Sequence, residues 1–190
     1  MTSENLSEQK TLLRRDILAK RDALDETLRI EHSLAAAEHG AGLDVFAGGQ
    51  FVPGTIVSGF LPIRSEIDAR PLMAQLAKQG ARLCLPVVVN KTTIEFRELI
   101  RGAELVQSGF GTVGPDENAT VLDPEILIVP LVAFSRAGGR LGYGGGFYDR
   151  TLEGLRAQRP TLAIGFAYAA QEMDDLPLES TDQPLDLIVT

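Results

Sequence analysis

The sequence is poor in the residues that most often cross-link a chain or carry nucleophilic chemistry, with one cysteine and two histidines. A single cysteine excludes an intrachain disulfide, and the apolar neighbours of Cys84 predict a buried thiol in a reducing compartment. His32 and His39 have the spacing of neither an i,i+4 zinc pair nor a catalytic triad, which favours a structural or exposed role. Catalysis by cysteine or histidine is therefore not expected.

Long apolar runs are also missing. The longest, 126–134, is interrupted by Pro130 and is too short to cross a bilayer, and no signal-like apolar stretch precedes Leu12. The net charge of −8 repels polyphosphate backbones at long range, which argues against a general nucleic-acid binder. We therefore expect a cytoplasmic protein without a membrane or nucleic-acid partner, in which local Lys and Arg residues bind any phosphate.

The order of apolar segments predicts the fold class. With 190 residues, the chain is long enough for one domain, 1–190, that buries a real core. Strands and helices alternate, which predicts a three-layer α/β/α sandwich around a mainly parallel sheet. The predicted strands are 55–61, 82–88, 94–99, 126–134, 161–166 and 186–189, and the predicted helices are 7–24, 26–38, 69–79, 147–158 and a short piece at 169–173.

Details of these segments give further expectations. Asp25 and Asp68 precede helical segments as N-caps would. The most apolar strand, 126–134, suits the middle of a parallel sheet, while 94–99 alternates like a strand at a sheet margin. Residues 101–124 are predicted to be a long loop or flap. Ligands of such sheets gather at the carboxyl ends of strands, where we expect four polar segments to converge: 64–68, 101–124, the glycine loop described below and 181–186.

The first predicted helix is amphipathic and basic. Its apolar stripe consists of Leu13, Ile17 and Leu24. Lys10 and Arg14 are four residues apart, so their side chains share a face and could meet on one polyanion; the alternative is a solvated basic face. The basic residues assigned to the other faces of this helix are Lys10, Arg14, Arg15, Lys20 and Arg21.

The most informative segment is the glycine loop, 138–150, because six of its first nine residues are glycine. Glycine lets backbone N–H groups approach a ligand closely, and the loop leads into a helix whose N-terminus favours phosphate. Asp149 lies in the first turn of that helix, where a carboxylate beside phosphate needs a cation such as Mg²⁺. The alternative is a flexible connection with an Asp that interacts only with the helix dipole.

The loop differs from common motifs. No Lys follows its glycines, which excludes a P-loop, and position 147 is Phe where a dinucleotide fingerprint needs glycine. Ser135 is not a nucleophile elbow, because its neighbours are Phe134 and Arg136. With these motifs excluded, the chemistry that the loop still allows is direct phosphoryl transfer without a covalent protein nucleophile.

Short motifs in a fixed order extend over most of the chain, and together they resemble one family, the 5-formyltetrahydrofolate cyclo-ligases, also called 5,10-methenyltetrahydrofolate synthetases. The segment 139–150 is the most specific of them. The motifs are Lys10-x-x-x-Arg14, Arg21, Arg29, Leu61-Pro62-x-x-x-Glu66, Leu85-Pro86, Val129-Pro130, Ala133-Phe134, 139–150, Ile164-Gly165, Gln171, Leu176-Pro177 and Asp182-x-x-Leu185-Asp186.

The resemblance implies ATP- and Mg²⁺-dependent closure of 5-formyltetrahydrofolate to 5,10-methenyltetrahydrofolate, with release of ADP and phosphate. It implies that the formyl oxygen attacks the γ-phosphorus, and that N10 captures the resulting iminium phosphate and expels phosphate. The protein then mainly positions the reactants and stabilises the transferring charge. The expected partners are ATP and a reduced folate, and the expected state is a monomer.

The resemblance also implies roles for residues. Lys10, Arg14 and Arg140 would bind the phosphates, and Asp149 with Asp182 would hold Mg²⁺. Lys10, Arg140 and the Tyr following the loop, Tyr148, would be catalytic. The remaining expected ATP-binding residues are Leu141, Gly142, Tyr143, Gly144, Gly145, Gly146, Phe147 and Tyr148.

For folate, the resemblance implies that Leu61 and Phe96 offer apolar surface, Glu66 accepts pterin N–H groups, and Tyr148 stacks on or closes over the ring. Leu61 and Phe96 are equally well explained as core, and Glu66 as a loop carboxylate. Tyr143 packs either on adenine or only on the sheet.

The chain departs from the family pattern at three positions. Gly114 replaces an acid before Pro115, Ser135 replaces an Asp, and Thr181 replaces a His before Asp182. These changes are compatible with unchanged chemistry in a subgroup or with weaker binding of the glutamate tail or metal.

Two other functions fit the same architecture. A sugar-phosphate isomerase or CoA-transferase-like enzyme would hold a substrate phosphate in the loop without ATP. A regulatory protein would bind folate or nucleotide without turnover.

Overall fold

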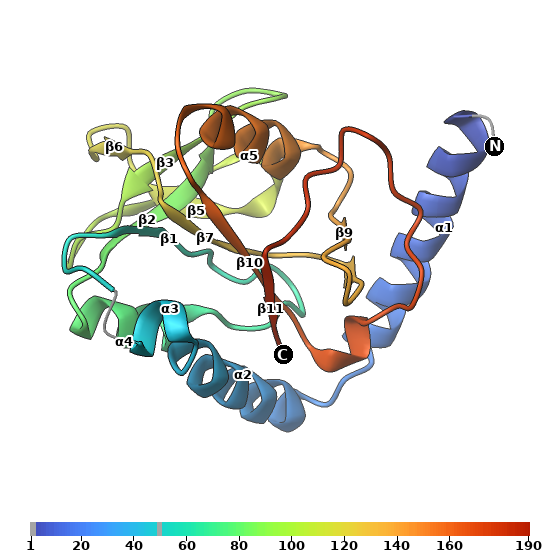
Figure 1. The fold of residues 1–190 in the computed structure, drawn as a ribbon, viewed down its shortest axis with the longest axis horizontal. Coiled ribbons are helices and arrows are strands. Elements are labelled where there is room, and N and C mark those ends of the chain that lie inside the picture. Colours follow the sequence, from blue (N-terminus) through green and yellow to red (C-terminus); the bar gives the residue numbers. More distant parts are fainter. Residues whose placement is uncertain (1–2, 49–50) are drawn as a thin grey trace.

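The computed structural model describes residues 3–48 and 51–190 and contains a seven-stranded sheet with helices on both faces (Figure 1). The strand order is β11-β10-β7-β1-β2-β3-β6. Pairings from β11 to β2 are parallel, whereas β2–β3 and β3–β6 are antiparallel. The strands of this sheet are β1 (Ile56–Ser58), β2 (Arg82–Val88), β3 (Ile94–Glu98), β6 (Val121–Leu122), β7 (Ile126–Val129), β10 (Leu162–Phe166) and β11 (Leu187–Val189).

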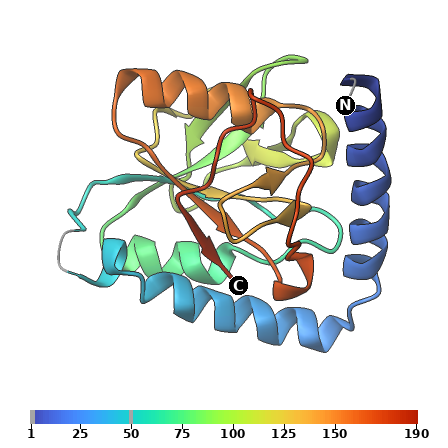
Figure 2. The same cartoon turned by 45° about the vertical axis from the view of Figure 1, so that its right-hand side comes forward.

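Two helical layers enclose the sheet, which confirms the predicted three-layer sandwich. α5 (Phe147–Gln158) covers one face, while α2 (Glu26–Ala41), α3 (Asp44–Ala47) and α4 (Arg70–Lys78) cover the other (Figures 1 and 2). Each face has its own buried cluster. Leu72 of α4 packs with Ile128 on one side of the sheet, and Leu152 of α5 packs with Leu127 on the other. Adjacent residues of β7 thus point to opposite faces, as the pleat of a strand requires.

α1 (Ser3–Asp22) stands outside these layers, beside the C-terminal segment (Figures 1 and 2). Ile17 anchors it in a third cluster with Ala133 and Leu141. The predicted division of its faces is wrong, because Lys10 and Arg21 are 6% and 1% exposed and lie on the buried face with Ile17. Positions separated by three or four residues share one side of a helix, so these cations point toward the protein.

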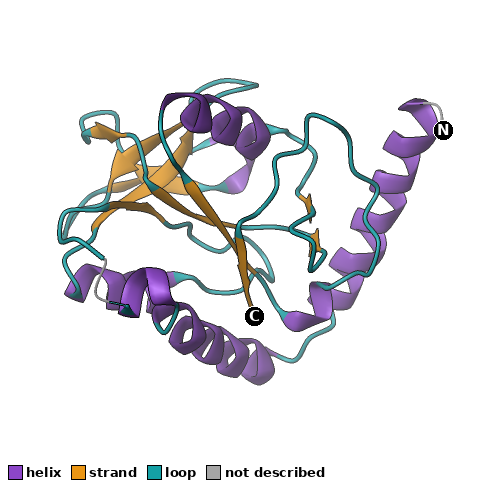
Figure 3. Cartoon of the chain, in the orientation of Figure 1, coloured by secondary structure: helices purple, strands orange, loops and turns teal. Residues whose placement is uncertain are grey.

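The run 126–134 forms two strands. β7 ends at Val129, Pro130 follows it, and β8 (Ala133–Phe134) leaves the sheet to pair with β9 (Arg140–Leu141) in a small hairpin (Figure 3). Proline lacks the N–H group that a central strand needs, which explains the break. The central position predicted for this run is confirmed for β7, because β1 and β10 flank it in parallel.

The segment 101–124 is not a featureless flap. It contains β4 (Leu105–Gln107), a 3₁₀ turn (Gly109–Gly111), β5 (Val113–Pro115) and β6. β4 and β5 pair with each other, and β5 contacts β2. β3 has a neighbour on each side, so it is next to the sheet margin, which β6 forms.

The predicted capping residues fare differently. Asp25 is the N-cap of α2 and accepts hydrogen bonds from the backbone of Thr27 and Leu28. The N-cap of α4 is Ala69 instead of Asp68, although Asp68 still accepts a bond from the Arg70 backbone. A second 3₁₀ turn, Ala169–Gln171, replaces the helical piece predicted at 169–173.

Other sequence expectations agree with the fold. Cys84 is buried, and this burial raises the pKa of its thiol to about 12. Both histidines are exposed. Among residues 3–48 and 51–190, no helix combines the length and apolarity needed to cross a bilayer.

Candidate functional site

The glycine loop leads from the β8–β9 hairpin into α5. Gly144 and Gly146 have φ values of 97° and 63°, which glycine adopts without strain. Gly146 is the N-cap of α5 and provides no side-chain cap, and a Cβ there would lie 2.6 Å from a guanidinium nitrogen of Arg150. A helix start without a side-chain cap leaves its first-turn N–H groups to other acceptors, of which phosphate is a favourable one.

Lys10 connects α1 to the C-terminal segment. Its Nζ lies 2.7 Å from Asp182 Oδ2 and 2.7 Å from Glu179 Oε2. Burial alone would lower the pKa of this ammonium, but the bonds to Asp182 and Glu179 outweigh it and the pKa is raised. Lys10 therefore remains a cation in a largely buried position.

Arg140 and Asp149 form a second ion pair beneath the glycine loop. Arg140 Nη2 donates to Asp149 Oδ1 at 2.5 Å, and the backbone N–H of Gln183 donates to the same oxygen at 3.1 Å. Asp149 is thus bonded to the backbone of the residue that follows Asp182. The buried Nε of Arg140 has no hydrogen-bond partner among the described residues, so the guanidinium keeps an unused donor.

Arg14 lies against the loop itself. Its Nε donates to the carbonyl of Gly142 at 2.8 Å, and a Cβ on Gly144 would lie 3.4 Å from the guanidinium carbon. Burial lowers the pKa of Arg14 from its very high ordinary value without threatening its charge. We call the set of Lys10, Arg14, Arg140, Asp149 and Asp182 the ion-pair side of the site.

The ion-pair side has the donors for a magnesium ion only in part. Among the described residues, no cluster of three or more His, Cys, Asp or Glu could hold a metal. Mg²⁺, however, is usually bound by one or two carboxylates together with phosphate oxygens. Asp149 and Asp182 are candidates for that role, because Gln183, the residue after Asp182, bonds to Asp149 and because the cationic partners of both carboxylates are suited to phosphate.

A second region, the Glu66 side, consists of Arg21, Leu61, Glu66 and Tyr143. Glu66 Oε2 accepts from the Ile63 backbone at 2.9 Å within a turn. Tyr143 crosses from the glycine loop, and its hydroxyl donates to Glu66 Oε1 at 2.7 Å. Burial raises the pKa of Glu66 despite these bonds. The carboxylate therefore faces the glycine loop, and each of its oxygens accepts one hydrogen bond from the protein.

Three of the four predicted polar segments meet here. Glu66, of segment 64–68, contacts the glycine loop, and Gln183, of segment 181–186, contacts Asp149. The segment 181–186 leads into the amino end of β11. It therefore does not follow the carboxyl end of a strand, as the sequence-based prediction required. The fourth segment, 101–124, packs on β2 and β3 instead.

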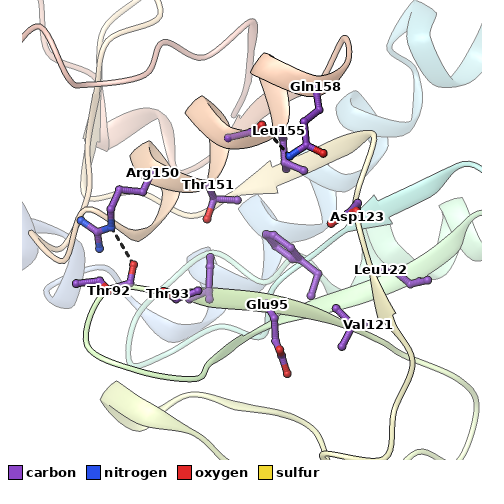
Figure 4. Close-up of a pocket in the computed structure, with 13 residues that line it drawn as sticks. Thr92, Thr93, Glu95, Val121, Leu122, Asp123, Arg150, Thr151, Leu155 and Gln158 are labelled. Carbon is purple, nitrogen blue, oxygen red and sulfur yellow. Dashed lines mark hydrogen bonds between the residues drawn. The ribbon is translucent and has the colours of Figure 1, made fainter.

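Leu61 and Phe96 do not form one wall. Leu61 packs against the cluster beneath α2 and α4, whereas Phe96 is 4% exposed in the cluster beneath α5. Phe96 also borders a groove of about 390 Å³ between α5 and the strands β3 and β6. Figure 4 shows the labelled lining of this groove, where Arg150 donates to the Thr92 carbonyl at 2.8 Å. Glu66 and Tyr143 are not among its lining residues.

Tyr148 is partly buried beside the ion-pair side. Its hydroxyl has no hydrogen-bond partner among the described residues, and the Arg140 guanidinium carbon lies 5.8 Å from its ring centroid. Burial raises the pKa of the Tyr148 hydroxyl, so it stays protonated at neutral pH. In this conformation, the Tyr148 ring packs against the Arg140 guanidinium.

Sequence reasoning missed several contributors. Glu179 shares Lys10 with Asp182, and the only available signal was their spacing of three residues. Arg21 had a clearer signal, because it shares one helical face with Lys10, Arg14 and Ile17.

The three departures from the family pattern have different settings. Gly114 has no room for a side chain, since a Cβ would lie 2.6 Å from Val87 Cγ2. Ser135 is buried and its hydroxyl accepts from the Gly139 backbone at 3.2 Å. Thr181 is exposed. The glycine is thus required by local packing, and the serine supports the hairpin that carries the loop.

Comparisons with known proteins are consistent across sequence and structure. Residues 6–190 match the 5-formyltetrahydrofolate cyclo-ligase family. The chain is 37% identical over 140 residues to the 5-formyltetrahydrofolate cyclo-ligase of Escherichia coli K12, covering 70% of this chain and 76% of the relative. It is 28% identical over 190 residues to that of Mycolicibacterium smegmatis, covering 95% and 93%.

Two solved structures share the fold. The 5,10-methenyltetrahydrofolate synthetase of Aquifex aeolicus superposes with a TM-score of 0.77 at 32% identity, covering 95% of this chain and 88% of the other. That of Mycoplasma pneumoniae gives a TM-score of 0.74 at 25% identity, covering 95% and 97%. These matches carry the names of enzymes, and the family match covers nearly the whole chain. The chain therefore belongs to the 5-formyltetrahydrofolate cyclo-ligase family.

Proposed function

We propose that this enzyme closes 5-formyltetrahydrofolate to 5,10-methenyltetrahydrofolate, using ATP and Mg²⁺ and releasing ADP and phosphate. One observation carries the proposal beyond the family name. Two of the three cations suited to phosphate are paired with a carboxylate suited to Mg²⁺: Lys10 with Asp182, and Arg140 with Asp149. Asp149 lies in the first turn of α5, whose N-cap provides no side-chain hydrogen bond, and the backbone N–H of Gln183, the residue after Asp182, donates to Asp149. Bound MgATP would separate the charges, with phosphate oxygens replacing the carboxylates on the cations.

The nucleotide phosphates would lie along the glycine loop. Lys10 and Arg140 would neutralise the charge that moves during phosphoryl transfer, and Arg14 would hold the loop through Gly142. Backbone N–H groups of the loop would surround the phosphate oxygens. The metal would be held by Asp149 and Asp182, and when bound it would screen the charge repulsion between the attacking oxygen and the phosphate.

The folate would enter on the Glu66 side. The Glu66 carboxylate would accept N–H groups of the pterin, with Leu61 providing apolar surface beside it. This placement orients the formyl oxygen toward the ion-pair side, where phosphorylation makes that oxygen a leaving group for attack by N10. No covalent protein nucleophile is required, in keeping with the buried, high-pKa thiol of Cys84.

The test is a direct assay of product absorbance with 5-formyltetrahydrofolate, ATP and Mg²⁺. Methenyltetrahydrofolate should accumulate only when all three are present, and ADP should form in equal amount. Omission of ATP and addition of a chelator are the matched controls. An absence of product under conditions where a known cyclo-ligase is active would reject the proposal.

A further inference from the structure

A buried arginine with unused donors lies next to the proposed folate subsite. Arg21 is 1% exposed, and its Nε donates to the Ser65 hydroxyl at 3.0 Å. Its two terminal nitrogens, Nη1 and Nη2, are buried and have no hydrogen-bond partner among the described residues. Leaving a buried guanidinium unsatisfied is costly, so such a group in a native structure calls for a partner that binds there.

The side chain that covers this arginine belongs to the glycine loop. The Arg21 guanidinium carbon lies 5.8 Å from the ring centroid of Tyr143, while the hydroxyl of the same ring donates to Glu66 Oε1. Tyr143 therefore presents a flat ring to a cation and a hydrogen-bond donor to a carboxylate. Tyr143 as a residue is 41% exposed, so a ligand can reach it from solvent.

A pterin has the same two features. The pyrimidinone ring of a reduced pterin is flat, and its edge carries N–H donors beside a carbonyl oxygen. The N–H donors match the Glu66 carboxylate, and the carbonyl oxygen matches the terminal nitrogens of Arg21 that have no hydrogen-bond partner among the described residues. The ring face can take the cation–π position that Tyr143 now occupies.

We propose that Tyr143 occupies the pterin subsite of the free enzyme, that reduced folate displaces it, and that Arg21 is a binding residue of the opened subsite. The proposal rests on the function proposed above and names residues of its folate site. Gly142 and Gly144 flank Tyr143 and give the backbone the freedom to carry the ring away. Folate binding then detaches the glycine loop from Glu66, which links the folate subsite to the loop that would hold ATP.

The displacement can be observed directly, because the chain has three tyrosines and no tryptophan. Protein labelled with 3-fluorotyrosine should give one fluorine resonance for each tyrosine, and the Tyr143→Phe variant identifies that of Tyr143. Saturating 5-formyltetrahydrofolate without ATP should shift this resonance, whereas p-aminobenzoylglutamate, which lacks the pterin, should not. An unmoved Tyr143 resonance at saturation overturns the proposal.

Affinity measurements test the competition. Calorimetric titration with 5-formyltetrahydrofolate should give a dissociation constant about tenfold lower for Tyr143→Phe, which loses the internal hydrogen bond, and lower still for Tyr143→Ala. Tyr168→Phe is the matched control, because Tyr168 donates to the backbone carbonyl of Glu66 at 3.2 Å, and it should show no tightening. Equal or weaker folate binding by both Tyr143 variants overturns the proposal.

Arg21→Lys tests the second part. Lysine keeps the charge but loses the planar fork, so folate should bind about tenfold more weakly while the ATP dissociation constant is unchanged. A melting curve verifies that the variant is folded, and if it is not, the fluorine spectra of the intact protein decide. Unchanged folate affinity in a folded Arg21→Lys variant rejects the role of Arg21.

The outcomes separate this inference from the proposed function. A shifted Tyr143 resonance without methenyltetrahydrofolate formation would leave the subsite standing and reject the reaction. Product formation with an unmoved Tyr143 resonance would support the reaction and reject the proposed subsite.

Discussion

The two sides of the site neutralise their charges in different ways. On the ion-pair side, each buried cation has a carboxylate partner within 2.7 Å, apart from Arg14, which uses a carbonyl. On the Glu66 side, the carboxylate is satisfied by a hydroxyl and a backbone amide, and the nearby cation keeps unused donors. The first side is therefore arranged to exchange ions, and the second to exchange hydrogen bonds with an uncharged ring.

This difference predicts which substrate each variant affects. Breaking an ion pair should change MgATP binding and turnover, and changing Glu66 should alter folate binding. Removal of one partner of an ion pair also leaves the other charge without its partner, which can destabilise the fold. A melting curve should therefore accompany the kinetics of every variant.

The largest effect is expected for Asp149→Asn. Loss of this carboxylate removes a proposed metal ligand and unpairs Arg140, so kcat should fall by about a hundredfold or more with the fold intact. Steady-state assays across a Mg²⁺ titration measure the loss. Glu153→Gln, an exposed acid on the same helix, is the matched control and should keep its activity. Full Mg²⁺-dependent activity in Asp149→Asn would contradict the metal assignment.

Lys10→Ala should mainly affect the nucleotide. The loss of a charge-assisted contact to phosphate raises the KM for ATP about tenfold to a hundredfold, with a much smaller change in the KM for folate. Lys20→Ala removes an exposed charge from the same helix and should leave both constants unchanged. If Lys10→Ala raised both KM values equally, its phosphate role would be rejected.

Glu66→Gln should show the opposite preference. Gln can still accept the Tyr143 hydroxyl, but it loses the charge that attracts pterin N–H groups, so the KM for folate should rise about tenfold while that for ATP stays constant. Initial rates with each substrate varied in turn give both values. A larger effect on ATP would mean that the two sides are not separable.

The smallest effect concerns stability and pH. Burial raises the pKa of Glu66 in the folded protein above the ordinary value of 4.5, so the carboxyl favours folding most at low pH, and this contribution is lost as the pH rises through the folded pKa. The wild type should therefore lose stability relative to Glu66→Gln as the pH rises from about 4.5. Urea unfolding of both proteins across that range measures it, and a difference that stays constant or reverses would refute the burial effect.

The sequence predicted the fold well where local signals coincide with packing. β2 and α5 have the predicted bounds, because apolar periodicity, glycine and helix-start residues all agree there. The strand predicted at 126–134 was too long, because Pro130 was interpreted as an interruption within one strand, whereas β7 ends just before it. In 101–124, the short strands β5 and β6 contact β2 and β3 of the main sheet, a signal that local propensity does not contain.

The ion-pair side was largely predictable and the Glu66 side was not. Asp149 and Arg140 lie in one contiguous motif, so the resemblance named both, and the structure brings them together as an ion pair. Tyr143 and Glu66 are 77 positions apart in the sequence, and no local pattern in either segment predicts their contact. The buried face of α1 was misread because hydrophobicity was used to orient it, whereas its partner surface supplies carboxylates that accept cations.

The contact of Lys10 with Asp182 also has a consequence during synthesis. The two residues are separated by 172 positions, so the ion pair cannot form until almost the whole chain has been translated. At about 5–20 residues per second, Lys10 waits roughly ten to thirty seconds for its carboxylate. Until then, the nascent chain lacks the Lys10–Asp182 contact and cannot assemble the proposed nucleotide site.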